Sequence, residues 1–187
     1  MSRLTEQILE RVEAVEAQLA IRELAARYAV AVDGRDLDAV VSLFVDDINA
    51  GENGTGRDAL RAFYARSLGR FYRSMHHVGG QTIELIDRDH ARGQVYCRAE
   101  HEVGQRWMIA LMSYHDDYER RGGQWLFARR RPYMWVASDW VSRPAGPEFV
   151  DWEGYRGAML PQRLPAWRDF WDAAGPETES GVTSFPA

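Results

Sequence analysis

Two adjacent histidines are the residues of this sequence best suited to acid–base chemistry. His76 and His77 open a short segment that continues with Val78-Gly79-Gly80. An unperturbed imidazole titrates near ~6.5, close to neutral pH, so it can take up and return a proton. Neighbouring residues of a β-strand face opposite sides of the sheet, and a slip of one residue reverses both. We expect His76 to face a pocket and His77 to face outward; the alternative for His76 is a satisfied histidine at a strand edge.

Asp33 is the next candidate, because a carboxylate is unusual where a helix ends. It closes the first predicted helix and precedes Gly34. The carboxyl end of a helix carries partial negative charge, which disfavours an ionised acid. Two roles fit: a local turn with Gly34, or a hydrogen bond to a histidine. In the second role Asp33 would fix the tautomer of His76 and raise the basicity of its other nitrogen. Such general acid–base help accelerates reactions roughly 10²–10⁴-fold.

His101 and several apolar residues are candidates for the pocket wall. On the strand expected after His76, alternate residues share one face: Val95, Cys97, Ala99 and His101. Small side chains beside one imidazole are typical of a pocket wall, whereas His101 equally fits a strand end at the surface. Large side chains on the following strands indicate either core packing or a bulky apolar or aromatic substrate: Met108, Met112, Tyr114, Tyr133 and Trp135. Arg130, within a run of three arginines, would bind an anionic or phenolic group if it turns inward.

The sequence predicts no metal and no cofactor. His76, His101 and Asp33 would satisfy a two-histidine, one-carboxylate site by count, but no local spacing such as HxH or HExxH supports it. Cys97 is the only cysteine, which excludes an intrachain disulfide and a zinc site made of cysteines. The sequence has no lysine, and this excludes a Schiff-base lysine.

The composition fits one globular domain with a small-molecule partner. Of the 187 residues, 45% are hydrophobic and 27% are charged. The formal charge of -5 argues against nucleic acid as a partner, because phosphate binding requires a basic face. Residues 1–19 place charges among their apolar positions, unlike a signal peptide or a membrane span. We therefore expect a cytoplasmic protein without a membrane partner.

Three helices are expected to come first. The first spans Ser2–Val32, and it is long enough that residues 1–18 are expected to pack on another subunit or to fray as an arm. Gly34 is expected to end it in the left-handed conformation. A second helix follows over Asp36–Phe44, with Asp36 as its N-cap. Thr55 and Asp58 read as a capping box that opens a third helix.

The period then changes from helical to alternating, which predicts four long antiparallel strands. Their expected ranges are His76–Ile86, Ala91–Val103, Gln105–Glu119 and Gln124–Ala137. Helices followed by a run of strands indicate an α+β fold, here over residues 1–137. Residues 138–187 are rich in tryptophan and proline, and we expect this C-terminal extension to pack on the barrel or on a neighbouring subunit.

Three segments resemble the SnoaL-like proteins of the nuclear transport factor 2 superfamily. Residues 20–44 (AIRELAARYAVAVDGRDLDAVVSLF) resemble the opening of these proteins, and residues 118–125 (YERRGGQW) resemble their last hairpin. Residues 76–80 (HHVGG) resemble the segment that carries the catalytic histidine of scytalone dehydratases. The resemblance implies a cystatin-like curved antiparallel sheet that forms a cone with three N-terminal helices.

The resemblance also implies site residues, an assembly and cofactor-independent chemistry. It implies that Asp33 and His76 form the acid–base pair, and that His101, 25 residues after His76, is a second active-site histidine. Bile acid 7α-dehydratases have a tyrosine five residues before their aspartate, which corresponds to Tyr28. From the helix alone, Tyr28 is a core residue turned away from Asp33. Related proteins imply a homo-oligomer, either a trimer or a dimer.

The predicted function is that of a lyase or dehydratase. Its substrate would be a bulky hydrophobic or aromatic hydroxylated small molecule that loses water or a small fragment such as formaldehyde. Scytalone itself is not expected, because Met112 and Tyr114 stand where scytalone dehydratases contact their substrate. The alternatives are an isomerase or cyclase of steroid or polyketide type, and a non-catalytic binding or accessory protein. A buried polar pair favours an enzyme, because such a pair is costly without a use.

Overall fold

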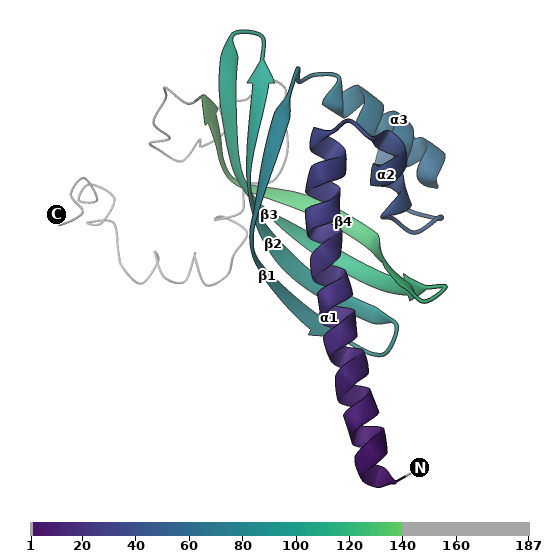
Figure 1. The fold of residues 1–187 in the computed structure, drawn as a ribbon. Helices are drawn as coiled ribbons and strands as arrows, with labels where there is room; N and C mark the ends of the chain where they lie inside the picture. Colours follow the sequence, from purple (N-terminus) through teal and green to yellow (C-terminus); the bar gives the residue numbers. More distant parts are fainter. Residues whose placement is uncertain (1, 140–187) are drawn as a thin grey trace, which may run out of the picture.

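Three helices cover one face of a four-stranded antiparallel sheet. The computed structural model describes residues 2–139. The helices are α1 (Arg3–Asp33), α2 (Leu37–Ser42) and α3 (Arg57–Leu68), with a short 3-10 turn at Gly51–Asn53. The strands are β1 (Ser74–Leu85), β2 (His90–Val103), β3 (Arg106–Arg121) and β4 (Gln124–Asp139). They pair in the order β1-β2-β3-β4 (Figure 1). The predicted α+β fold with a curved antiparallel sheet is confirmed.

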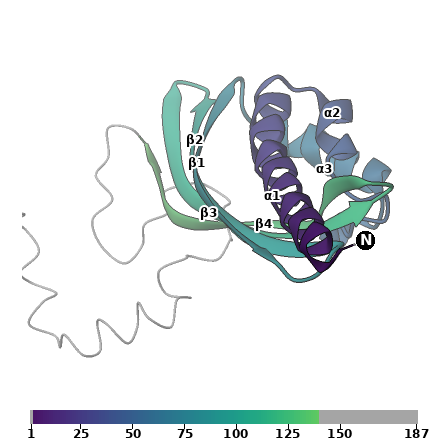
Figure 2. The same cartoon turned by 60° about the horizontal axis from the view of Figure 1, so that its bottom comes forward.

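The sheet curves around α1, so that the helices lie on its concave face (Figure 2). The second half of α1 packs into this concave face through Ile21, Leu24 and Tyr28, which are all buried. Alternate residues of β2 from Val95 to His101 are buried against the helices, as the alternation of small and polar residues predicts. The acid–base candidates therefore lie on the side of the sheet that faces the helices.

The end of α1 differs from the predicted glycine cap. Gly34 keeps a right-handed conformation with φ of -74°, and Arg35 takes the left-handed one with φ of 58°. The strain of a positive φ at a non-glycine residue is offset by the Arg35 side chain, which donates hydrogen bonds to the carbonyl oxygens of Val32 (2.9 Å) and Phe71 (3.2 Å). The turn after α1 is thus fixed by a long-range contact rather than by glycine.

The predicted capping box at α3 is also wrong. Gly56 is the N-cap, and no side chain caps the helix there. Thr55 instead forms an isolated bridge with Asn49, so its backbone belongs to a loop that folds back on itself. By contrast, Asp36 caps α2 as predicted, accepting a hydrogen bond from the Ala39 backbone N–H at 2.9 Å.

Bulges interrupt the regular alternation of the strands. The β3–β4 register shifts between Asp117 and Tyr118, and Phe127 and Arg130 therefore share the concave side although they are three positions apart in the strand. A second shift, between Leu111 and Met112, leaves Trp135 between two paired residues of β4 without a paired residue of its own on β3. These bulges decide which β4 side chains reach the interior.

The predicted C-terminal extension lies outside the described residues, apart from Ser138 and Asp139, which end β4. Within residues 2–139, no helix is both long and apolar enough to span a membrane.

Candidate active site

Asp33 and His76 meet at the junction of α1 and β1. Oδ1 of Asp33 lies 2.7 Å from Nδ1 of His76, and Oδ2 accepts a hydrogen bond of 2.7 Å from the His76 backbone N–H. The His76 side chain is 7% exposed, whereas that of His77 is 54% exposed. The structure therefore places the first histidine in the interior, against the acid, and turns its neighbour outward.

Further hydrogen bonds hold the Asp33 carboxylate. Ser74 Oγ donates to Asp33 Oδ1 at 3.0 Å, and Arg35 Nη1 donates to Ser74 Oγ at 2.7 Å. Partial burial tends to raise the pKa of Asp33, but the hydrogen bonds from His76 and Ser74 outweigh it and lower the pKa below its ordinary value. Asp33 is therefore an ionised acceptor, although it lies at the carboxyl end of a helix.

His101 lies beside His76 on the neighbouring strand. The two ring centroids are 5.6 Å apart and nearly perpendicular, and the ring of Phe71 lies 4.4 Å from His101 on another side. Desolvation, followed by the charge of His76, lowers the pKa of His101 to about 4. His101 is consequently neutral at physiological pH and can serve as a hydrogen-bonding group, not as a standing cation.

A row of three alanines continues from His76 across the concave face. The strand registers pair His76 with Ala99, Ala99 with Ala110, and Ala110 with Ala137. The next row holds Cys97, Met112 and Met134. Burial raises the pKa of the Cys97 thiol to about 12, so this cysteine is a neutral wall residue and not a nucleophile.

Tyr28 links the histidines to a buried aromatic cluster. Its ring centroid lies 6.4 Å from that of His76 and 5.8 Å from that of Tyr114. The Arg130 guanidinium stacks over the rings of Tyr28 (4.2 Å) and Tyr114 (4.0 Å), and its side chain is 3% exposed. Its charge is balanced by buried Asp116, whose Oδ1 lies 3.3 Å from Nε of Arg130. Desolvation keeps the pKa of Tyr28 above its ordinary value, so its hydroxyl remains protonated.

A cavity of about 340 Å³ opens beside this cluster. Its walls come from the loop after α2, from α3 and from β4, and they include Tyr64 and Arg130. The Tyr64 hydroxyl donates to that of Tyr28 at 3.1 Å. Neither His76 nor Asp33 lines this cavity, and the Tyr28–Tyr64 pair of hydrogen-bonded phenols connects it to His76.

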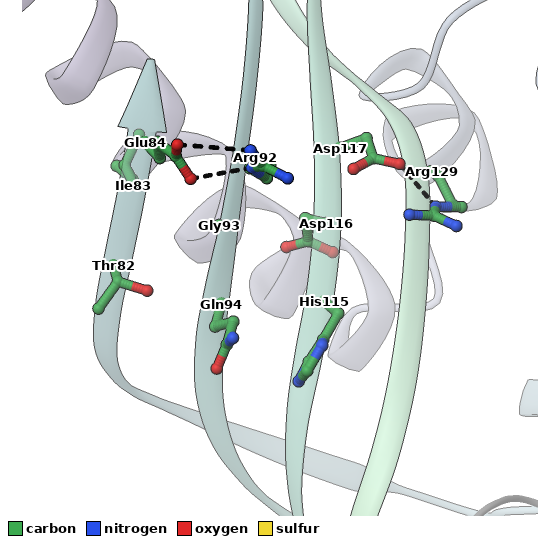
Figure 3. Close-up of a pocket in the computed structure, with 10 residues that line it drawn as sticks. All are labelled: Thr82, Ile83, Glu84, Arg92, Gly93, Gln94, His115, Asp116, Asp117 and Arg129. Carbon is green, nitrogen blue, oxygen red and sulfur yellow. Dashed lines mark hydrogen bonds and ion pairs between the residues drawn. The ribbon is translucent and has the colours of Figure 1, made fainter. Parts of the chain in front are cut away.

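Trp135 is separate from the other predicted site residues. Its ring stacks on Tyr96 on the outer face of the sheet, with ring centroids 6.4 Å apart and planes 18° apart. The outer face also bears a hollow of about 400 Å³, shown in Figure 3. The charges around that hollow are paired across strands, Arg92 with Glu84 and Arg129 with Asp117. We therefore place the candidate site on the concave face.

A family model decides the relationship of the chain. The model for the SnoaL-like domain matches residues 13–131, which is more than half of the sequence. The chain belongs to the SnoaL-like domain family. A comparison with curated protein sequences finds no match.

Solved structures share this SnoaL-like architecture. A provisionally named scytalone dehydratase from Novosphingobium aromaticivorans is 25% identical, with a TM-score of 0.62, over 74% of this chain and 97% of its own. A type 3 hexachlorocyclohexane dehydrochlorinase (LinA) from Novosphingobium barchaimii is 19% identical, with a TM-score of 0.64, over 73% and 99%. A protein of unknown function with a cystatin-like fold from Nostoc punctiforme is 23% identical, with a TM-score of 0.53, over 63% and 90%.

Three contributors to this SnoaL-like site were not predicted from the sequence. Ser74 precedes His76 by two residues, so strand alternation would have placed both on one face. Arg35 lies in the same short motif as Asp33, but its contact with Ser74 spans 39 positions of the chain. Tyr64 lies on α3 with no local pattern that distinguishes it from a core residue. Among residues 2–139, no group of three histidine, cysteine or acidic side chains is arranged to hold a metal ion.

Proposed function

We propose that this chain is a cofactor-independent lyase of the dehydratase type, in which His76, oriented by Asp33, moves the proton. The observation that carries the proposal is the 2.7 Å contact between Nδ1 of His76 and Oδ1 of Asp33 in a largely buried setting. An ionised carboxylate at Nδ1 holds the ring in the tautomer with a proton on that nitrogen. Nε2 is then the nitrogen that exchanges a proton with the substrate.

The proposed reaction is an elimination. Nε2 of His76 takes a proton from a carbon next to the one that bears a hydroxyl group. The electrons of the broken C–H bond form a carbon–carbon double bond, and the C–O bond breaks. The imidazolium of His76 returns its proton to the departing hydroxide, so that water leaves and His76 is restored. Asp33 stabilises the imidazolium between these two steps.

Tyr28 and His101 are suited to assist the leaving group by hydrogen bonding. Both are buried, and their ring centroids lie 6.4 Å and 5.6 Å from that of His76. The raised pKa of Tyr28 and the lowered pKa of His101 keep both groups neutral near pH 7. Each can donate a hydrogen bond to a developing oxyanion without adding a second charge to an apolar site.

The walls indicate a hydrophobic, aromatic substrate with one polar end. The alanine row next to His76 carries no side chain longer than a methyl group, and methionines line the rows on either side. Arg130 lines the cavity beside Tyr64. Its guanidinium group would favour a phenolic or carbonyl oxygen of the substrate there. The relatives named as a dehydratase and a dehydrochlorinase support an elimination.

A panel of aryl β-hydroxyketones tests this function, because their dehydration gives conjugated enones with strong ultraviolet absorbance. The native chain is expected to accelerate enone formation from at least one member. His76→Gln is expected to lose roughly 10²–10⁴-fold of that rate, because the base is gone. His77→Gln is the matched control: its ring is 54% exposed, and the rate should be unchanged. Equal rates for native protein and His76→Gln would refute the role of His76.

A further inference from the structure

The N-terminal half of α1 carries an apolar stripe that faces away from the protein's own core. Ile8, Val12, Val15 and Leu19 are 46% to 62% exposed. At about 100° per residue, these four positions lie on the side of the helix opposite to the core-facing Ile21, Leu24 and Tyr28. Figure 1 shows this purple half of α1 running past the edge of the sheet toward the N-terminus.

The side of this N-terminal half that faces the sheet carries small and polar side chains. Ala14 and Ala17 are half-buried there, across a hollow lined by Leu85 and Trp125. Glu13 accepts a hydrogen bond of 3.3 Å from Arg88 of the β1–β2 turn. The apolar stripe is therefore not an ordinary amphipathic face turned toward the core, and a continuous apolar stripe of this kind indicates a protein contact.

The spacing of the stripe is that of a coiled-coil seam. Successive steps of 4, 3 and 4 residues place Ile8 and Val15 at d positions and Val12 and Leu19 at a positions. Arg11 then falls at a g position and Glu16 at the following e position. In a parallel bundle these two positions face each other across the seam, so each Arg11 meets a Glu16 of another copy. In an antiparallel pair Arg11 would face Gln18 and Glu16 would face Leu9, which gives no charge pairing.

We propose that residues 5–19 of α1 form a parallel helical bundle with the same segment of other copies of this chain. A short isolated helix would be marginal in water, but this segment continues directly from the packed half of α1, so its helix is already nucleated. The sheet and core of each copy would lie on the outside of the bundle, because the stripe points away from them. β-branched residues at both d positions favour three helices over two.

Single cysteines test the parallel register. Native Cys97 is buried, so Val15→Cys adds one reactive thiol at the seam of the full-length chain. Ala20→Cys, exposed on the same helix but off the stripe, is the control. Under mild oxidation Val15→Cys should link to itself at least about tenfold faster than Ala20→Cys, because association raises the effective concentration of the thiols. Equal rates would overturn the proposal, as would faster linkage in a mixture of Val12→Cys and Val15→Cys, which is the antiparallel result.

A charge exchange tests the pairing of Arg11 with Glu16. In the Val15→Cys background, Arg11→Glu or Glu16→Arg alone should slow the cross-linking, because like charges then meet across the seam. The double exchange should restore the cross-linking rate of Val15→Cys alone. Slow cross-linking in the double variant, with helix content unchanged by circular dichroism, would show that these residues do not face each other and would overturn the register.

Discussion

His101 is buried, and desolvation first and the charge of His76 second lower its pKa to about 4, whereas an unperturbed histidine titrates near 6.5. Between these values the unfolded chain binds a proton that the folded chain does not. The free energy of unfolding therefore keeps its full value above pH 6.5 and decreases as the pH falls from about 6.5 toward 4. The loss at low pH should approach roughly 3 kcal/mol at most.

Urea denaturation at several pH values between 4 and 7 measures this effect. His101→Asn removes the titrating group, so the free energy of unfolding of the variant should depend less steeply on pH than that of the native protein. Parallel curves for the two proteins would contradict the assignment of a neutral, buried imidazole.

The buried pair of Asp116 and Arg130 is expected to behave as one unit. Their side chains are 0% and 3% exposed, so removing either partner leaves the other charge buried without compensation. Asp116→Asn and Arg130→Met should each cost about 3–5 kcal/mol of unfolding free energy. The double variant should cost clearly less than the sum of the two. Urea unfolding of the native protein, the two single variants and the double variant at pH 7.5 gives the coupling free energy between the two side chains. Simple additivity of the two single losses would count against a direct ion pair.

At the scale of residues, the sequence predicted the acid–base pair better than its surroundings. Asp33 and His76 were recognisable because each occupies a position where its residue type is unusual or matches a family motif. Ser74 and Arg35 support the pair through contacts made only in the folded chain. Trp135 was assigned to the pocket, but a bulge near it shifts the alternation, and no local signal marks that bulge. The inward turn of Arg130 likewise depends on a bulge.

At the scale of elements, β1 leaves no room for a side chain at Gly93 of β2. A Cβ atom at this position would lie 2.3 Å from the carbonyl oxygen of Thr82, a backbone atom that cannot move without breaking the strand pairing. Gly93→Ala should therefore lower the free energy of unfolding by about 2–3 kcal/mol. Gly80→Ala is the control on β1, because nothing lies within 4 Å of its added Cβ. Thermal melts compare the two, and an equal Tm for both variants would contradict the close approach.

The positions of the elements could be read from periodicity, whereas the caps expected at Gly34 and Thr55 could not. The first helix was expected over Ser2–Val32 and spans Arg3–Asp33, because a long repeat of apolar positions is a strong signal. The caps at Gly34 and Thr55 failed because tertiary contacts decided them: the Arg35 side chain holds the first turn, and a bridge to Asn49 holds Thr55.

At the scale of the whole molecule, the proposed self-association through the N-terminal half of α1 would make stability depend on protein concentration. Binding between folded copies stabilises the folded state by mass action. The Tm of the native chain should therefore rise as protein concentration increases. The combined Val12→Glu and Val15→Glu variant should show little rise, because two exposed seam residues become charged. Calorimetry over a hundredfold range of protein concentration measures the two Tm values. An equal rise in Tm for both proteins would place the contact between copies elsewhere.

The fold class followed from the sequence because the period changes from helical to alternating once, after the third helix. The assembly did not follow, because the same stripe fits an arm that frays and an arm that pairs. The orientation of the stripe relative to the core supports the proposal of an arm that pairs, and it depends on how the second half of α1 packs on the sheet.

The most direct test of the central claim is the protonation pattern of the His76 ring. Nitrogen-15 NMR of the ring nitrogens, assigned with His76→Gln, reports which nitrogen carries the proton when the ring is neutral. The contact with Asp33 predicts a proton on Nδ1 and a bare Nε2, a pattern that Asp33→Asn should weaken. A neutral ring with its proton on Nε2 and none on Nδ1 would contradict the account, because the nitrogen assigned to the substrate would then have no lone pair to act as a base.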